Sequence, residues 1–157
     1  MSILSTGYFL VSREAIKIMY SQNLGGSIVF IASKNGLTAS PLASAYCTAK
    51  ASEIHLARCL ALETAPSGIR VNVINPDAVL QGSKIWSGKW LDERMSAYNK
   101  NNKEDLEEHY KQRSLLKKSV LPVDIAEAAY FMASDLSSKS TGNIINVDSG
   151  NIQSFTR

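Results

Sequence analysis

Three residues of this chain have the types and spacing that hydride-transfer chemistry needs. Tyr46 and Lys50 stand four apart in the run Tyr46-Cys47-Thr48-Ala49-Lys50, and Ser33 precedes Tyr46 by thirteen residues. Residues four apart lie on one face of a helix, and a serine at the end of a preceding strand can meet them there. The phenol, the ammonium and the hydroxyl are therefore expected to converge. The alternative is a surface Tyr–Lys pair together with a strand-end serine that only serves a turn.

Strands and helices alternate along the rest of the chain. Residues 27–33 form a short run rich in β-branched residues and bounded by glycine, which is typical of a buried parallel strand. Apolar periodicity and stop signals predict the other elements. These are helices over 2–24, 43–65 and 124–134, and strands over 69–75 and 143–148.

The segment 83–118 is polar, and four aromatic residues are spread along it. It is expected to hold two or three amphipathic helices. Its aromatic residues either line a lid over a substrate or pack the helices together, and the sequence favours neither role. They are Trp86, Trp90, Tyr98 and Tyr110.

Alternation of helix and strand implies right-handed crossovers and a parallel sheet covered by helices. Only three strands are predicted, and a strand as apolar as 28–32 should have neighbours on both sides. We therefore expect an α/β fold of the Rossmann type, in which a doubly wound parallel sheet is represented by its C-terminal half of about three strands and its N-terminal half is absent. Residues 1–157 form one domain, expected to be truncated.

Composition excludes several classes of protein. The net charge of +3 is small for 157 residues, and the basic residues are scattered, so no nucleic-acid partner is expected. No apolar run approaches the roughly 20 residues of a membrane helix. Cys47 and Cys59 lie in one predicted helix, about 18 Å apart at 1.5 Å per residue, which is too far for a disulfide. Reduced cysteines suit a cytoplasmic chain.

The histidines do not indicate a metal site. Neither His55 nor His109 has a second histidine or a cysteine at metal-ligand spacing. A structural or solvent role is favoured for both.

In their order along the chain, these motifs resemble the C-terminal half of the short-chain dehydrogenase/reductase family. The resemblance covers nearly all 157 residues. It rests on Ser33, Gly36, Pro41 and Tyr46-x-x-x-Lys50, on the stretch from Gly68 to Pro76, on Asp124-Ile125-Ala126, on Thr141-Gly142 and on Val147-Asp148. The stretches 75–83, with Ile85-Trp86, and 106–113 further resemble the dehydrogenase part of bifunctional rhamnulose-1-phosphate aldolase/short-chain dehydrogenase proteins.

The resemblance implies a role for each motif residue. Tyr46 would be the general acid/base on the substrate oxygen, and Ser33 would polarise that oxygen. A free tyrosine titrates near 10, so a cation beside it is needed to lower its pKa; Lys50 would supply the cation. The cofactor would be NAD or NADP, bound by Tyr46, Lys50, Pro76 and Val79. Substrate would contact Ser33, Asn35, Gln81 and Trp86 beneath a helical lid formed by 83–118.

Three departures from the family pattern stand out. Asp77 follows Pro76 where the family usually has glycine, and adds a negative charge beside the expected cofactor. The asparagine that the family carries near the position of Leu4 is missing, so its proton-relay water site is in doubt. The Gly-rich turn that binds pyrophosphate at a helix N-terminus is also missing, so the sequence does not indicate whether NAD or NADP is preferred.

Three hypotheses for function follow. The first is an oxidoreductase domain of a longer enzyme, acting on a small hydroxy-aldehyde or a sugar-derived alcohol or carbonyl such as lactaldehyde. The second is a truncated, inactive family member that serves as an oligomerisation module, because in the family the helices corresponding to 2–24 and 43–65 pair between subunits. The third is a fragment of a longer bifunctional enzyme. We expect a small-molecule substrate and a homo-oligomer.

Overall fold

A computed structural model describes residues 1–155 and contains one sheet of three parallel strands. The strands are β1 (Gly26–Ile31), β2 (Ile69–Pro76) and β3 (Ile144–Val147), in the order β1-β2-β3. Gly26 pairs with Ile69 at one end of the register, and Pro76 pairs with Val147 at the other. The expected α/β fold with a parallel sheet is therefore confirmed, and β1 and β3 are its two edges.

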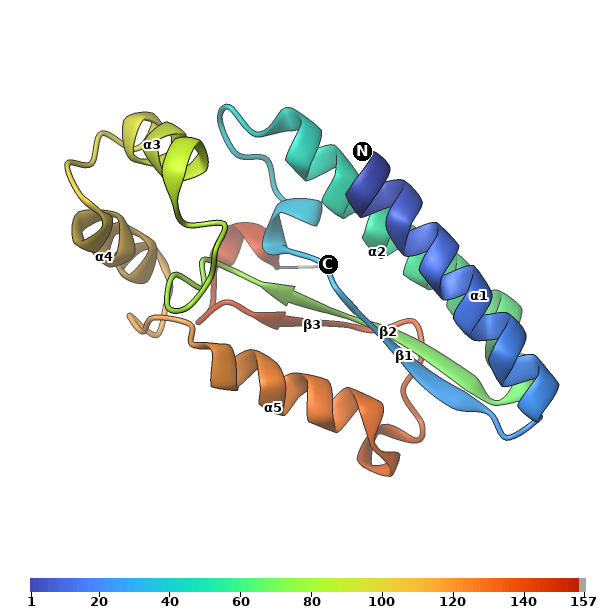
Figure 1. The fold of residues 1–157 in the computed structure, drawn as a ribbon. Helices are drawn as coiled ribbons and strands as arrows, with labels where there is room; N and C mark the ends of the chain where they lie inside the picture. Colours follow the sequence, from blue (N-terminus) through green and yellow to red (C-terminus); the bar gives the residue numbers. More distant parts are fainter. Residues whose placement is uncertain (156–157) are drawn as a thin grey trace.

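Helices cover both faces of this sheet (Figure 1). Helices α1 (Gly7–Gln22) and α2 (Ser44–Thr64) lie side by side on one face. Helix α5 (Pro122–Ala133) packs against all three strands from the other face. The predicted helix 2–24 begins with a π-helical turn over Ser2–Thr6. Helix α5 begins at Pro122, because proline is suited to a first helical position, where its missing N–H costs nothing.

The core lies between β2 and the two helices on the first face. Val71, Val73 and Ile69 of β2 are almost fully buried, together with Phe30 of β1 and Ile54 of α2. Strand β2 is central, so nearly all its side chains are buried, whereas most of β1 is only half-buried. This difference follows from the position of β1 at the edge of the sheet.

Polar side chains of β2 anchor the chain around it. Asn72 is fully buried; its amide donates to the Ser140 carbonyl at 2.8 Å and its oxygen accepts from the Asn143 backbone N–H at 3.1 Å. The Val71 backbone N–H donates to the Thr141 hydroxyl at 3.0 Å. These bonds fix the turn that leads into β3, and so set the register of that edge strand.

The segment 83–118 contains two helices, α3 (Gly88–Ala97) and α4 (Lys103–Arg113). They lie beyond the carboxyl ends of the strands (Figure 1). The Asn102 side chain caps α4 by accepting from the Asp105 backbone N–H at 2.7 Å. Among the helices of residues 1–155, none has both the length and the apolar character to cross a bilayer.

Candidate active site

A pocket of about 480 Å³ opens at the carboxyl ends of β1 and β2, where ligands sit in parallel α/β sheets. Loops after both strands form its floor, and α3 and α4 contribute its far wall. The structure brings most of the predicted site residues together on its lining: Ser33, Asn35, Tyr46, Pro76, Val79, Gln81 and Trp86.

Ser33 and Tyr46 meet at the floor of this pocket. Ser33 follows β1 and caps the short turn Lys34–Gly36, its hydroxyl accepting from the Asn35 backbone N–H at 3.2 Å. Burial raises the pKa of Tyr46; a hydrogen bond with the Ser33 side chain opposes this shift, and the charge of Glu53 adds to it. The raised pKa is opposite to the expected direction, because desolvation of the phenolate outweighs the stabilisation within the site.

Lys50 lies beneath the pocket and not on its lining. Its Nζ donates to the Ile31 carbonyl at 3.2 Å and to Glu53 Oε2 at 2.9 Å. The same ammonium lies 6.0 Å from the centre of the Tyr46 ring. Lys50 is thus next to the phenol as expected, but its charge is already paired with a buried carboxylate.

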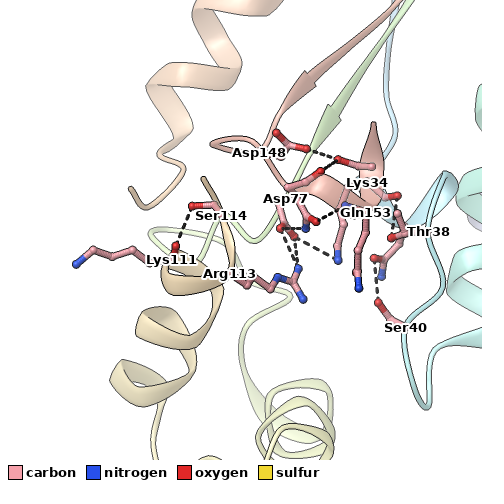
Figure 2. Close-up of polar contacts among 12 residues, drawn as sticks. Lys34, Thr38, Ser40, Asp77, Lys111, Arg113, Ser114, Asp148 and Gln153 are labelled. Carbon is pink, nitrogen blue, oxygen red and sulfur yellow. Dashed lines mark hydrogen bonds and ion pairs between the residues drawn. The ribbon is translucent and has the colours of Figure 1, made fainter. Parts of the chain in front are cut away.

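Asp77 joins the two strand ends through ionic contacts (Figure 2). Its carboxylate accepts from Arg113 of α4 at 2.9 and 3.0 Å and from the Asn151 amide at 2.8 Å. Lys34, which is almost fully buried, lies 3.9 Å from it. Burial lowers the pKa of Lys34, and Asp77 partly offsets this effect. The residue that replaces the usual glycine therefore ties α4 to the loop after Ser33.

The far wall of the pocket is aromatic. The Trp90 ring lies 5.3 Å from the Tyr46 ring, and Trp86 packs edge-on against Tyr110 at 5.4 Å. The Arg94 guanidinium lies 4.8 Å above the Trp90 ring and donates to the Leu42 carbonyl at 3.1 Å. Three of the four aromatic residues singled out in 83–118 thus line the pocket. The fourth, Tyr98, packs against His109 and Tyr110.

Three residues of this region were not expected from the sequence: Lys34, Glu53 and Arg94. Lys34 directly follows the predicted Ser33, and a lysine at the end of a buried strand was the available signal. Glu53 lies one helical turn after Lys50, a spacing that places the two side chains together. No sequence signal pointed to Arg94, whose bond to Leu42 spans 52 residues.

The residues present fit the nicotinamide end of a dinucleotide. Pro76 and Val79 line the pocket beside Tyr46, and Lys50 has one further ammonium proton beyond the two bonds already described. The Gly-rich turn that would hold pyrophosphate is not part of the chain. Residues 1–155 contain no group of three or more His, Cys, Asp or Glu that could hold a metal ion.

Comparisons with known proteins agree with this geometry. Residues 1–151 match the family described as Enoyl-(Acyl carrier protein) reductase. The uncharacterized oxidoreductase YuxG of Bacillus subtilis is 54% identical over 157 residues, which are 100% of this chain and 23% of that protein. The crystal structure of levodione reductase superposes with a TM-score of 0.80 at 29% identity, covering 98% of this chain and 55% of the other. A short-chain dehydrogenase from Leptospira borgpetersenii, solved with bound NAD⁺, gives 0.76 at 25% identity, covering 93% and 52%.

The three-stranded parallel sheet with its covering helices matches about half of the Rossmann-type fold of these solved oxidoreductases. The chain spans about half the length of these two solved relatives. It belongs to the short-chain dehydrogenase/reductase family, of which it represents the C-terminal portion.

Proposed function

We propose that the protein containing these residues is a nicotinamide-dependent oxidoreductase that interconverts an alcohol and a carbonyl, with Tyr46 as general acid/base. The observation that carries the proposal is the meeting of Ser33 and Tyr46 on one pocket with the Lys50 ammonium beneath them. A surface Tyr–Lys pair would have no such pocket.

In the oxidation direction, the Tyr46 phenolate accepts the proton of the substrate hydroxyl. The Ser33 hydroxyl donates to the substrate oxygen and holds it against Tyr46; such a bond contributes to the rate because it strengthens as charge develops on that oxygen. Bound nicotinamide supplies the acceptor for the hydride that leaves the carbon. In the reduction direction Tyr46 returns the proton to the oxygen.

NAD or NADP is the proposed cofactor, because the family relative from Leptospira carries NAD⁺. Lys50 would hold the nicotinamide ribose with its remaining proton. Pro76 and Val79, after β2, would present backbone groups to the carboxamide. The phosphates would be held by residues outside this chain.

The proposed substrate is a small hydroxy-aldehyde or a sugar-derived alcohol or carbonyl, with lactaldehyde the first to test. The pocket volume of about 480 Å³ suits a small molecule beside a nicotinamide ring. Asn35 and Gln81 offer amide groups to substrate hydroxyls, and Trp86 offers an apolar wall. The resemblance of residues 75–83 and 106–113 is the basis of the further proposal that this domain is joined to an aldolase of the rhamnulose-1-phosphate type. The match to only 23% of YuxG leaves room in that relative for another domain of any kind.

We also propose a homo-oligomer that forms through α1 and α2, in the cytoplasm. Several large apolar side chains of these helices are exposed, among them Val11 at 71%, Ile18 at 58% and Leu62 at 81%. Light scattering after size exclusion checks this proposal. A monomer at micromolar concentration would contradict it.

The test of the function is Tyr46→Phe in the complete polypeptide, with lactaldehyde, NAD(H) and NADP(H). Loss of the general acid/base is expected to lower kcat about 10³-fold, with little change in stability. Tyr130→Phe is the control, since Tyr130 is 70% exposed on α5. Wild-type turnover in Tyr46→Phe would overturn the assignment.

The alternative is a non-catalytic oligomerisation module. It is distinguished by the wild-type protein alone. Oligomers that neither bind nor turn over a nicotinamide cofactor would favour the module over the enzyme.

A further inference from the structure

A carboxylate is buried directly beneath the candidate active site. Glu53 of α2 is 0% exposed, and its Oε2 accepts from Lys50 Nζ at 2.9 Å. Its second oxygen, Oε1, is buried without a hydrogen-bond partner. Neither the pocket lining nor the family motif uses this residue.

The surroundings of Glu53 contain few charged or titratable groups. From α2 it faces Lys50 and Tyr46, and from α1 it faces Tyr8. The Tyr8 hydroxyl donates to the Ile31 carbonyl at 2.9 Å, the same oxygen that accepts from Lys50. Strand β1 itself carries no titratable side chain. The turn that packs on α2 carries Lys34, which is instead directed toward Asp77.

We propose that Glu53 is a positioning residue that fixes the Lys50 ammonium against β1 and beside the Tyr46 ring. This inference rests on the proposed function, in which Tyr46 is the general acid/base. Glu53 acts through Lys50 and touches neither substrate nor cofactor.

Stability alone does not explain a glutamate here. A buried ion pair loses about as much by desolvation as it gains by attraction, and an apolar side chain of similar volume is often at least as stabilising. Apart from Lys50 and Thr64, the other buried positions of α2 are apolar, as Ile54 and Ala57 show. A carboxylate at this place is instead suited to hold the lysine in one position.

The electrostatic consequence has a definite sign. A carboxylate at hydrogen-bonding distance from Lys50 offsets part of the positive field that would favour a phenolate. Burial is the main cause that raises the pKa of Tyr46, and the charge of Glu53 adds to it; burial likewise raises the pKa of Tyr8 to about 12, again with a contribution from Glu53. Removing the charge while keeping a hydrogen-bond acceptor must therefore favour the Tyr46 phenolate.

The test is Glu53→Gln in the complete polypeptide, because the amide oxygen can still accept from Lys50. In the pH profile of kcat/KM for alcohol oxidation, the acid limb reports the pKa of the base in the free enzyme. In Glu53→Gln this limb is expected to move about one pH unit lower. Glu63→Gln, at an exposed position of the same helix, should leave the limb unmoved. A purely structural role for Glu53 predicts changed stability with an unmoved limb, and that result would overturn the proposal.

A second readout separates this inference from the proposed function. Ultraviolet absorbance of tyrosinate, taken as the difference between the wild-type protein and Tyr46→Phe, titrates Tyr46 without substrate. The midpoint is expected to fall in the Glu53→Gln background even if no substrate is turned over. If Glu53→Gln does not fold, Glu53→Leu replaces it, and an unchanged midpoint in that variant would equally refute the proposal.

Discussion

The two ends of the sheet differ in how completely the hydrogen bonds of their polar side chains are satisfied. At the amino end, Arg70 of β2 reaches the far end of α5 and is surrounded by acceptors. Its NH1 donates to the Met132 carbonyl at 3.0 Å and to Ser137 Oγ at 2.7 Å, and its NH2 donates to the Ser134 carbonyl at 3.1 Å. One guanidinium thus satisfies the carbonyls where α5 ends, a role typical of a structural residue.

At the carboxyl end, buried polar atoms lack partners. Arg94 makes one bond to a carbonyl, and its Nε has none. The buried side-chain atoms of residues 1–155 without a partner include five more around the same end: Glu53 Oε1, Asn75 Oδ1, Trp90 Nε1, His109 Nε2 and Arg113 Nε. Native proteins leave few such atoms, and in residues 1–155 they gather at the end of the sheet that carries the candidate active site.

The largest expected effect comes from replacing Arg70, whose guanidinium is surrounded by hydrogen-bond acceptors. Arg70→Met leaves several carbonyls near the end of α5 without a donor and should lower the free energy of unfolding by about 3 kcal/mol. Urea unfolding measures the change. Arg13→Met on the exposed side of α1 is the control and should cost under about 0.5 kcal/mol. Turnover per folded molecule should be unchanged in both, and a loss of kcat in Arg70→Met would break the contrast between the two ends.

A close contact at the carboxyl end gives the next effect. A Cβ on Gly36 would lie 2.8 Å from the Lys50 carbonyl oxygen and 2.4 Å from Ile54 Cδ1. Gly36→Ala must push the loop after Ser33 away from α2, at a cost of about 1–3 kcal/mol. Turnover should fall at least about tenfold, because Ser33 and Tyr46 are carried by the two parts that separate.

Gly7 provides the matched control for this variant. A Cβ there meets nothing closer than 3.7 Å, in an ordinary helical position. Gly7→Ala should be neutral or slightly stabilising. Equal losses of turnover in the two variants would contradict the role of the Gly36 contact.

The helices and strands could be predicted from the sequence because the patterns that indicate them are local. The period of apolar residues and the glycine and proline stops predicted all three strands and the helices that cover them to within a few residues. Helix spacing and the strand-end position of Ser33 also led to the expectation that Ser33 and Tyr46 meet. No local pattern shows that Lys34, Asp77 and Arg113 converge, because Arg113 lies 36 residues from Asp77 along the chain.

The direction in which the pKa of Tyr46 is shifted could not be predicted from the sequence either. The spacing of Tyr46 and Lys50 correctly placed a cation near the phenol, but the direction of the pKa depends on burial and on Glu53. The burial of Tyr46 and the position of Glu53 both follow from tertiary packing, because the face of α2 that carries them lies toward β1 and α1. An i,i+3 spacing from Lys50 is common on helix surfaces and does not by itself indicate a buried pair.

Replacing Arg94, the arginine at the other end of the sheet, sharpens the comparison. Arg94→Met removes one bond to the Leu42 carbonyl and keeps an apolar contact with Trp90, so it should cost only about 1 kcal/mol. The wall beside Tyr46 should nevertheless loosen, and KM for substrate should rise about fivefold, a loss of about 1 kcal/mol of binding. Urea unfolding and steady-state kinetics give the two numbers. A stability loss as large as that of Arg70→Met would contradict the distinction between Arg70, which makes many hydrogen bonds, and Arg94, which makes one.

The smallest expected effect is a pH dependence at His109. Burial lowers the pKa of His109, and the nearby charges of Lys100 and Arg113 lower it further. The unfolded chain therefore binds a proton at a higher pH than the folded one, so stability present at neutral pH is lost as the pH falls below about 6.5 toward the lowered pKa. His109→Gln should flatten the decline in unfolding free energy over that interval relative to the wild type. Urea unfolding at a series of pH values from 7.5 downward measures both slopes. Parallel slopes in His109→Gln and the wild type would show that the carboxyl end does not bury this imidazole at a measurable cost.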